Sequence, residues 1–318
     1  MRYTRLQLPT DTFIGENMGY MWMSPGMLDV NDHCRKKLDG VMKRTLIIEA
    51  GATKTEWAVS GREAMRFRTA GINCSVMPLE AIVNVVAEAE EYFRDISEDI
   101  TDIRFYGAGL VAGESIIVLD KAFKSVFPNA VIAYGSDLLA AARAAWGRDK
   151  GIVAILGTGS NSGFYDGSTI VENIRSGGFI LGDEGGGVSL GKALIADHIK
   201  GLLPKELERR LSEAYDVSYE NIVRNVYRGK NAAGYLASFA PFVFGNRDIE
   251  GVDAMIEDNL RNFVRRVLLR YDVGSYDVAV VGSFGCACRE DLVRIGKEYG
   301  VRFAEFIKSP VEVLVKEW

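Results

Sequence analysis

The sequence repeats one order of strands and helices, and this repeat constrains the fold more than any other feature. In each copy an apolar strand, beginning at Thr45 or at Gly151, enters a glycine-rich turn and returns as a second strand. A third strand and then alternating helices and strands follow in both copies. This order is typical of a ribonuclease H-like lobe. We therefore predict an α/β fold of two such lobes with a cleft between them, with a single doubly wound sheet as the alternative.

The length of 318 residues also favours two lobes, because single hydrophobic cores stop growing at about 250–300 residues. We expect a first lobe over 44–135 and a second over 136–309, with a helical insertion at about 202–271. The last helix, 310–318, should cross back onto the first lobe. Residues 1–43 hold six methionines and no sustained period, so we interpret them as a leader of uncertain order or the product of an upstream start codon.

Charge and composition favour a protein that acts on small molecules. The net charge of −5 argues against a nucleic-acid or anionic-membrane partner. No apolar run approaches the ~20 residues that span a bilayer, and no signal-peptide pattern opens the chain, so we expect a cytoplasmic location. The cysteines and histidines lack zinc-site spacing, and we interpret Cys286 and Cys288 as small semi-buried thiols on a loop. Assembly into a homodimer is left open.

Three glycine-rich loops follow apolar strands and could hold a nucleotide. Small residues in such turns let backbone N–H groups approach an anion closely. Taken singly, each could be a plain tight turn, but the first two occupy matching points of the repeat and should face each other across the cleft. The third follows a later strand of the second copy and could lie against the nucleoside. The loops are Gly51, Ala52, Thr53, Lys54 and Thr55; Gly157, Thr158, Gly159, Ser160 and Asn161; and Gly282, Ser283, Phe284 and Gly285.

Two further glycine motifs are alternative candidates for phosphate binding. The stretch from Gly186 to Lys192 has Walker A spacing, but Ala193 lacks the hydroxyl that a P-loop uses on Mg²⁺, so we interpret it as chance. The stretch from Gly107 to Ala112 fits a dinucleotide fingerprint, but no βαβ unit opens the chain. We predict instead that these glycines form the floor of the cleft on its substrate side.

Seven stretches match one known family in order: IIEAGATKTEW, AGIN, SDLLAAARA, AILGTGSNS, SGGFILGDEGGG, VAVVGSFG and KSP. By these stretches the chain, from about Arg44 to its C-terminus, resembles the BadF/BadG/BcrA/BcrD-type ATPases and, among them, the N-acetylglucosamine kinases. The resemblance implies a hexokinase/actin/Hsp70-like fold, that is, an actin-like ATPase. It also implies transfer of the γ-phosphoryl group of ATP to a sugar hydroxyl with Mg²⁺, and an amino sugar as the small-molecule partner.

The resemblance also implies which residues contact each ligand. The first two loops would contact phosphates, and Gly282 and Ser283 would lie near the adenosine. The predicted substrate set comprises Asn73, Gly177, Gly178 and Asp183, completed by Gly107, Asn161 and Glu184.

The sequence departs from the family pattern at three places. Glu49 stands where the family usually has Asp, at a position associated with the magnesium ion and its waters; the charge is kept, but the side chain is longer. Leu110 and Val111 stand where the mammalian sugar kinases carry an Asp, and Val313 where relatives commonly have Gly. A reduced or altered activity is one interpretation of these departures.

Phosphoryl transfer requires positioning, charge neutralisation and a carboxylate that accepts the hydroxyl proton. We assign the proton acceptor to Asp137, the grip on sugar hydroxyls to Asp183, and the orientation of hydrated Mg²⁺ to Glu49. Capping of the following helix is an equal alternative for Asp137, and capping or solvent exposure is the alternative for Asp183 and Glu184. The glycines around Asp183 favour a mobile loop that closes on a ligand.

Two other functions stay open at this stage. A BadF-type activator ATPase would drive electrons through an iron–sulfur cluster shared between subunits. It would need cysteines after the second phosphate loop, and none lies between Gly157 and Cys286. A non-catalytic nucleotide or sugar sensor would bind its ligands without releasing ADP.

Overall fold

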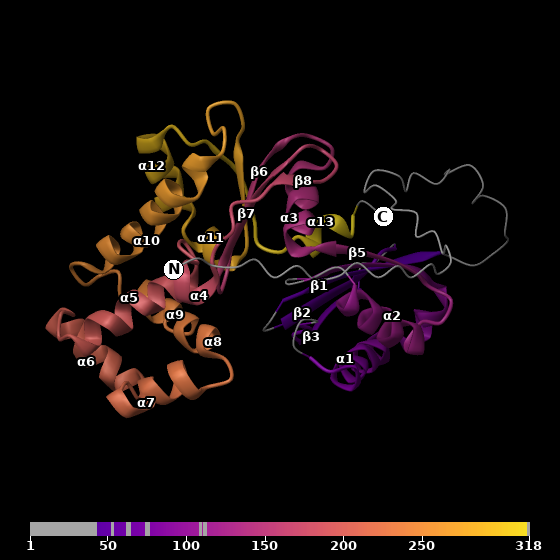
Figure 1. Cartoon of the computed structure of the whole chain (residues 1–318), viewed down its shortest axis with the longest axis horizontal. Coiled ribbons are helices and arrows are strands. Elements are labelled where there is room, and N and C mark those ends of the chain that lie inside the picture. Colours follow the sequence, from indigo (N-terminus) through magenta and orange to yellow (C-terminus); the bar gives the residue numbers. More distant parts are fainter. Residues whose placement is uncertain are drawn as a thin grey trace, which may run out of the picture. The chain divides into compact units, whose positions relative to one another are not determined.

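The strands divide between two sheets of the same design. The computed structural model describes residues 43–51, 54–61, 65–73, 77–107, 110 and 113–316. Each sheet has five strands, with the first strand of its sequence copy at the centre and that copy's second and third strands on one side. Helices surround both sheets (Figure 1). The predicted α/β fold of two duplicated lobes is confirmed, and the single-sheet alternative is wrong.

Alternate side chains of β1 point to opposite faces of the first sheet, and helices pack on the face that carries Leu46 and Ile48. Leu46 and Ile48 point to one face and Ile47 to the other, because side chains alternate along a strand. The face with Leu46 and Ile48 packs against α1 (Leu79–Tyr92) and α2 (Glu114–Val126), which lie together below the sheet in Figure 1. The strands, in the order β3-β2-β1-β4-β5, are β1 (Arg44–Ala50), β2 (Lys54–Val59), β3 (Met65–Ala70), β4 (Ile100–Gly107) and β5 (Val131–Ser136).

The second sheet repeats this arrangement. The central strand β6 pairs antiparallel with β7 and parallel with β9, just as β1 pairs with β2 and β4. The strands, in the order β10-β9-β6-β7-β8, are β6 (Gly151–Leu156), β7 (Ser160–Tyr165), β8 (Ile170–Glu172), β9 (Val278–Val281) and β10 (Phe303–Ile307).

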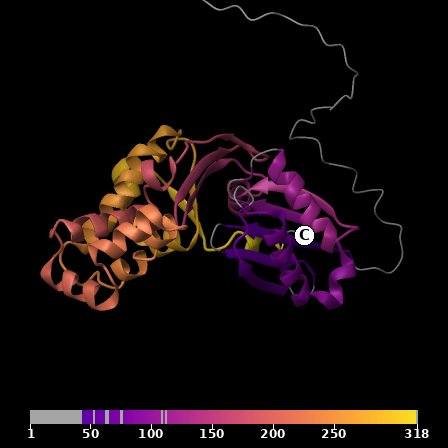
Figure 2. The same cartoon turned by 60° about the horizontal axis from the view of Figure 1, so that its bottom comes forward.

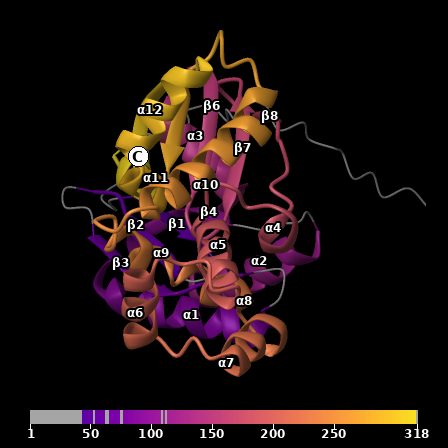
Figure 3. The ribbon, with the colours of Figure 1, turned by 90° about the vertical axis from the view of Figure 1, so that its left-hand side faces the viewer.

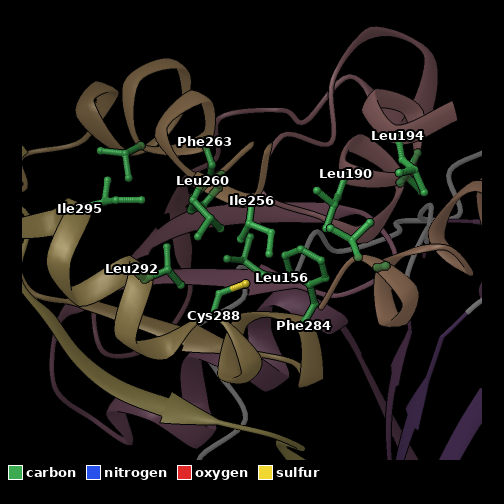
Figure 4. Packing of buried hydrophobic residues seen from close by; sticks show 14 of the residues in the cluster. Leu156, Leu190, Leu194, Ile256, Leu260, Phe263, Phe284, Cys288, Leu292 and Ile295 are labelled. Carbon is green, nitrogen blue, oxygen red and sulfur yellow. The ribbon is translucent and has the colours of Figure 1, made fainter. Parts of the chain in front are cut away.

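A group of helices lies between β8 and β9 in the sequence and packs into the core of the second lobe. It comprises α4 (Gly178–Leu181), α5 (Gly187–Ile199), α6 (Lys205–Ala214), α7 (Tyr219–Val223), the π-helix η2 (Arg224–Arg228), α8 (Ala232–Ala237), α9 (Ala240–Phe244), α10 (Val252–Arg266) and the 3₁₀ helix η3 (Leu268–Arg270). Helices α5 and α10 lie beside each other (Figure 3). Leu190 of α5 and Ile256, Leu260 and Phe263 of α10 are fully buried in one cluster with Leu156 of β6 (Figure 4). The sheet and the helices between β8 and β9 therefore share a single core.

The two sheets are linked through α3 (Asp137–Trp146) and α13 (Val311–Leu314). Val311 and Leu314 of α13 pack with Ile47 and Ala58 of the first sheet and with Ala140 of α3. The chain reaches α13 directly from β10 of the second sheet, and this crossing is visible as the yellow segment between the two groups of helices in Figure 2. The last helix thus packs on the first sheet, although it is shorter than 310–318.

Helix α1 ends at Tyr92, and the 3₁₀ helix η1 (Arg94–Asp99) follows it. One local expectation is wrong. The cysteine pair is not on a loop, because α11 (Ser283–Ala287) and α12 (Arg289–Tyr299) flank Cys288. Cys288 is fully buried in the core (Figure 4), and this burial raises the pKa of its thiol to about 12. Within the described ranges, no helix has the length and apolarity needed to cross a bilayer.

Candidate active site

One cavity of about 760 Å³ brings the two glycine hairpins together. The β1–β2 turn borders it through Gly51 and Lys54, and the β6–β7 turn borders it through consecutive residues from Gly157 onward. The volume is in the range that small-molecule sites occupy. The residues predicted from sequence that line this cavity are Glu49, Gly51, Lys54, Asp137, Gly157, Thr158, Gly159, Ser160, Asn161, Gly177, Asp183, Gly282 and Ser283.

Not every amide of the two glycine hairpins is free to bind a ligand, contrary to expectation. The Gly51 amide donates to the Lys54 carbonyl at 2.9 Å, and the Gly157 amide donates to the Gly159 carbonyl at 3.0 Å, so both are used within their turns. In the described part of the chain, no hydrogen bond uses the amide of Thr158 or Gly159. Unused donors in a tight turn favour an anion. The second hairpin therefore leaves the amides of Thr158 and Gly159 available to an anion.

Asp183 joins the loop that follows β8 to the second hairpin. Its side chain is 8% exposed, and its Oδ1 accepts a hydrogen bond from the Ser160 amide at 3.3 Å. Its own amide donates to the Ser176 carbonyl at 3.2 Å. Its φ of 60° lies in the left-handed region that residues other than glycine rarely adopt. Solvent exposure does not explain this residue, and helix capping does not either, because the N-cap of α5 is Gly186.

Asp137 is not the cap of α3. That position belongs to Ser136, whose hydroxyl accepts a hydrogen bond from the Leu139 amide at 3.1 Å. Asp137 is thus the first residue of α3 rather than its N-cap. Asp137 lines the cavity, and its Oδ1 accepts from the adjacent Leu138 amide at 2.8 Å. Burial raises the pKa of this carboxyl, and a carboxylate with a raised pKa is a better proton acceptor near neutral pH.

Glu49, at the end of β1, has a carboxyl whose pKa is strongly raised. Its pKa is raised from 4.5 to about 7, mainly by burial and then by the charges of Glu56 and Asp137, against a lowering by Lys54. The carboxylates of Glu56 and Asp137 are thus close enough to oppose the ionisation of Glu49. Lys54 offsets part of this repulsion, and a bound cation would offset more of it.

The raised pKa of Glu49 predicts a pH-dependent stability in metal-free buffer. Below about pH 4.5 the carboxyl is protonated in both the folded and the unfolded state, so it does not reduce the free energy of unfolding. As the pH rises, the unfolded chain releases its proton first. The free energy of unfolding therefore falls until about pH 7. Glu49→Gln should remove this loss, which corresponds to roughly 3 kcal/mol. Urea unfolding of both proteins with a chelator present should show the variant gaining on the parent across this window. A constant difference would contradict the assignment.

Glu56 also lines the cavity, although it was not predicted from sequence. Its Oε1 lies 2.6 Å from Lys54 Nζ and 2.9 Å from Arg68 Nη2, and its Oε2 accepts from Ser309 Oγ at 2.5 Å. Burial raises the pKa of Glu56, but the hydrogen bonds from Lys54 and Ser309 and the charges of Lys54 and Arg68 outweigh it, so the net shift is downward. Glu56 therefore connects the first sheet to the segment that follows β10. An acidic residue directly before the apolar part of β2 was the signal for it.

Five predicted residues do not line the cavity. The Thr55 hydroxyl is buried and accepts from the Ile72 amide, so it is not available to a phosphate. The Glu184 carboxylate lies 2.8 Å from Arg266 Nε. The other three are Asn73, which precedes α1, Gly107, which ends β4, and Gly178, which begins α4. Ala52 and Thr53 lie outside the described residues, as does the leader through residue 42.

Several further lining residues come from segments with no motif to mark them. Lys308 and Ser309 follow β10, and they reach the cavity because β10 lies next to β9 in the sheet. Asn173, Arg175 and Ser176 come from the loop after β8. Lys308 and Arg175 are exposed cationic side chains, so they add positive charge at the rim of the cavity.

The Mg²⁺ that the family resemblance implies fits this set of side chains. No group of three or more His, Cys, Asp and Glu side chains within the described ranges could hold a metal ion by itself. Mg²⁺ on nucleotides needs no such cage, since it is usually held by one or two carboxylates together with phosphates and waters. Glu49, with Asp137 nearby, supplies that kind of ligand. The opposed ionisation of the two carboxylates is consistent with a cation between the protein and a nucleotide.

Comparison with known proteins places this geometry in a family. The chain is similar to a candidate N-acetylglucosamine kinase from Porphyromonas gingivalis, with 33% identity over 86% of this chain and 97% of that chain, and a TM-score of 0.82. A candidate N-acetylglucosamine kinase from Chromobacterium violaceum shares 16% identity over 87% of this chain and 99% of that one, with a TM-score of 0.70. A ROK family transcriptional regulator, homologous to the E. coli MLC protein, has 13% identity over 87% of this chain and 78% of that one, and a TM-score of 0.51.

The second and third similarities show the fold alone. No family model matches the sequence, and no curated protein matches it. The first similarity extends over nearly the whole length of the Porphyromonas protein at an identity that shows common family membership. The resemblance drawn from the glycine loops is thereby confirmed. The chain belongs to the BadF-type, N-acetylglucosamine kinase-like family of proteins with the actin-like ATPase fold.

Proposed function

We propose that the chain is an ATP-dependent carbohydrate kinase that phosphorylates a hydroxyl of an amino sugar, with N-acetylglucosamine as the first candidate. The observation that carries this proposal is the single cavity that holds both glycine hairpins together with Asp137 and Asp183. The similarity to the candidate N-acetylglucosamine kinase from Porphyromonas gingivalis supports the choice of acceptor.

Each carboxylate has a distinct role in this proposal. Asp137 accepts the proton of the attacking hydroxyl, for which its raised pKa suits it. Asp183, already oriented by the Ser160 amide, accepts hydrogen bonds from sugar hydroxyls. Glu49 holds the hydrated Mg²⁺, which when bound neutralises charge on the phosphates. The Thr158 and Gly159 amides and the Lys54 ammonium bind the phosphates.

A coupled assay of ADP release tests the proposal directly. The acceptors are N-acetylglucosamine, N-acetylmuramic acid, glucosamine and glucose, each with ATP and Mg²⁺ and each against a blank without sugar. The proposal requires sugar-dependent ADP release that is highest with an N-acetylated amino sugar. Nucleotide binding without any sugar-dependent release would instead indicate a sensor.

The activator-type ATPase is not favoured by the structure. Its shared iron–sulfur cluster would need accessible thiolates near the nucleotide site. Of the cysteines in the described ranges, Cys288 is fully buried, and burial raises the pKa of both Cys286 and Cys288. A raised pKa keeps these thiols protonated and disfavours metal ligation. Iron analysis of protein purified without oxygen should find no stoichiometric iron.

A further inference from the structure

The side-chain amide of Asn259 in α10 is bonded to the loop that carries Asp183. Its Oδ1 accepts a hydrogen bond from the Gly185 amide at 3.0 Å, and its Nδ2 donates to the Gly186 carbonyl at 3.2 Å. Asn259 is 6% exposed, so both bonds form away from solvent. One side chain therefore satisfies a buried donor and a buried acceptor of consecutive loop residues. Removing it would leave the Gly185 amide without a partner and the Gly186 carbonyl with the Leu190 amide alone, at 3.3 Å.

The same loop is packed tightly between α10 and the second glycine hairpin. A Cβ atom on Gly185 would lie 2.7 Å from Cβ of Phe263 in α10. A Cβ atom on Gly186 would lie 2.7 Å from the Gly159 backbone. On its far side the Gly187 amide donates to the Gly157 carbonyl at 2.9 Å. The loop thus lies in direct contact with both neighbours.

This packing bears on Asp183, whose backbone is in the left-handed region. A conformation of that kind persists only where the surroundings over-determine it. The Gly186 amide donates to the Asp183 carbonyl at 3.0 Å, so one of the two glycines held by Asn259 is bonded directly to Asp183. The amide of Asn259 therefore acts on the carboxylate of Asp183 through two residues of loop backbone.

We propose that Asn259 is a positioning residue for Asp183, and that it couples the helices between β8 and β9 to sugar binding. This inference rests on the proposed function, in which Asp183 holds sugar hydroxyls. Because Asn259 does not line the cavity, its effect on the reaction is indirect. The effect should fall on the sugar rather than on the nucleotide, since the phosphate donors are on the hairpin.

Steady-state kinetics of Asn259→Leu and Asn259→Asp test the inference. Leu approximates the shape of Asn without its polar atoms, and Asp keeps the acceptor for Gly185 but loses the donor to Gly186. We expect each variant to raise KM for the sugar about tenfold and to lower kcat/KM by up to about a hundredfold, as expected for a misplaced substrate ligand. KM for ATP should stay within about twofold of the parent. If Asn259→Leu does not fold, Asn259→Asp decides the question.

Asn246→Leu is the matched control, because Asn246 is also a buried asparagine of the same group of helices. It is 7% exposed, donates to the Phe242 carbonyl at 2.7 Å and accepts from Arg210 at 2.9 Å, and neither of these partners belongs to the Asp183 loop. This variant should lower the melting temperature but leave KM for the sugar within about twofold. An equal rise in sugar KM in the control would overturn the inference, and so would parental kinetics in the Asn259 variants.

The parent protein, assayed beside the variants, separates the two proposals. No sugar-dependent turnover in the parent would refute the proposed function. Turnover in the parent with unchanged sugar KM in both Asn259 variants would refute the positioning role alone.

Discussion

Asp137→Asn is expected to lower kcat about a thousandfold while leaving nucleotide affinity close to that of the parent. The substitution keeps the shape of the side chain and its acceptor oxygen for the Leu138 amide, but it removes the carboxylate that takes the hydroxyl proton. Rates from the coupled assay, and ADP affinities by calorimetry, measure the two quantities separately. Turnover near the parental rate would show that another group accepts the proton.

The adjacent serine provides the control for this variant. Ser136→Ala removes the cap of α3 and should cost about 1 kcal/mol of stability, yet it leaves the Asp137 carboxylate in place. We expect it to keep kcat. Asp137→Asn, in contrast, removes a buried charge that opposes the ionisation of Glu49, so it should not destabilise the fold. Loss of activity without loss of stability would then identify a chemical role.

The duplicated fold could be predicted because its signals are local and are repeated. The strands that begin near Thr45 and Gly151 each lead into a glycine turn, and such a turn between apolar strands predicts a hairpin at either place. The matching positions in the two copies were enough to expect a shared cleft. Which glycine amides are free could not be predicted from the sequence. In the structure, the Gly51 and Gly157 amides form hydrogen bonds within their own turns.

The residues that were missed depend on contacts between distant segments. Ser309 reaches Glu56 across 253 positions of sequence, and no local pattern announces that pairing. Asn259 left a weaker trace: it shares the spacing of Ile256, Leu260 and Phe263, so it is a polar residue within an apolar stripe of α10. A buried polar side chain in such a stripe needs a partner, but only the fold identifies the partner as the Gly185–Gly186 backbone.

Gly186→Ala is expected to lower kcat/KM by about a hundredfold or more, through a steric effect on the site rather than through backbone strain. Gly186 has φ −98° and ψ 168°, which alanine adopts freely. The added Cβ, however, would lie 2.7 Å from both the carbonyl carbon and the oxygen of Gly159. Backbone atoms cannot rotate away, so the hairpin and the Asp183 loop must separate. Affinities for ADP and for the sugar should therefore both fall.

Gly274→Ala is the control for an added methyl group, since its Cβ would meet only Asp272 Oδ1 at 3.6 Å, an ordinary contact. It should keep parental kinetics. Gly185→Ala would be a poorer test, because the φ of 78° at Gly185 adds backbone strain to the clash with Phe263. If Gly186→Ala retained parental affinities for both ligands, the hairpin and the loop would not have to touch for binding. Since one contact is predicted to weaken two ligands at once, the variant tests whether the phosphate and sugar halves of the cavity form a single site.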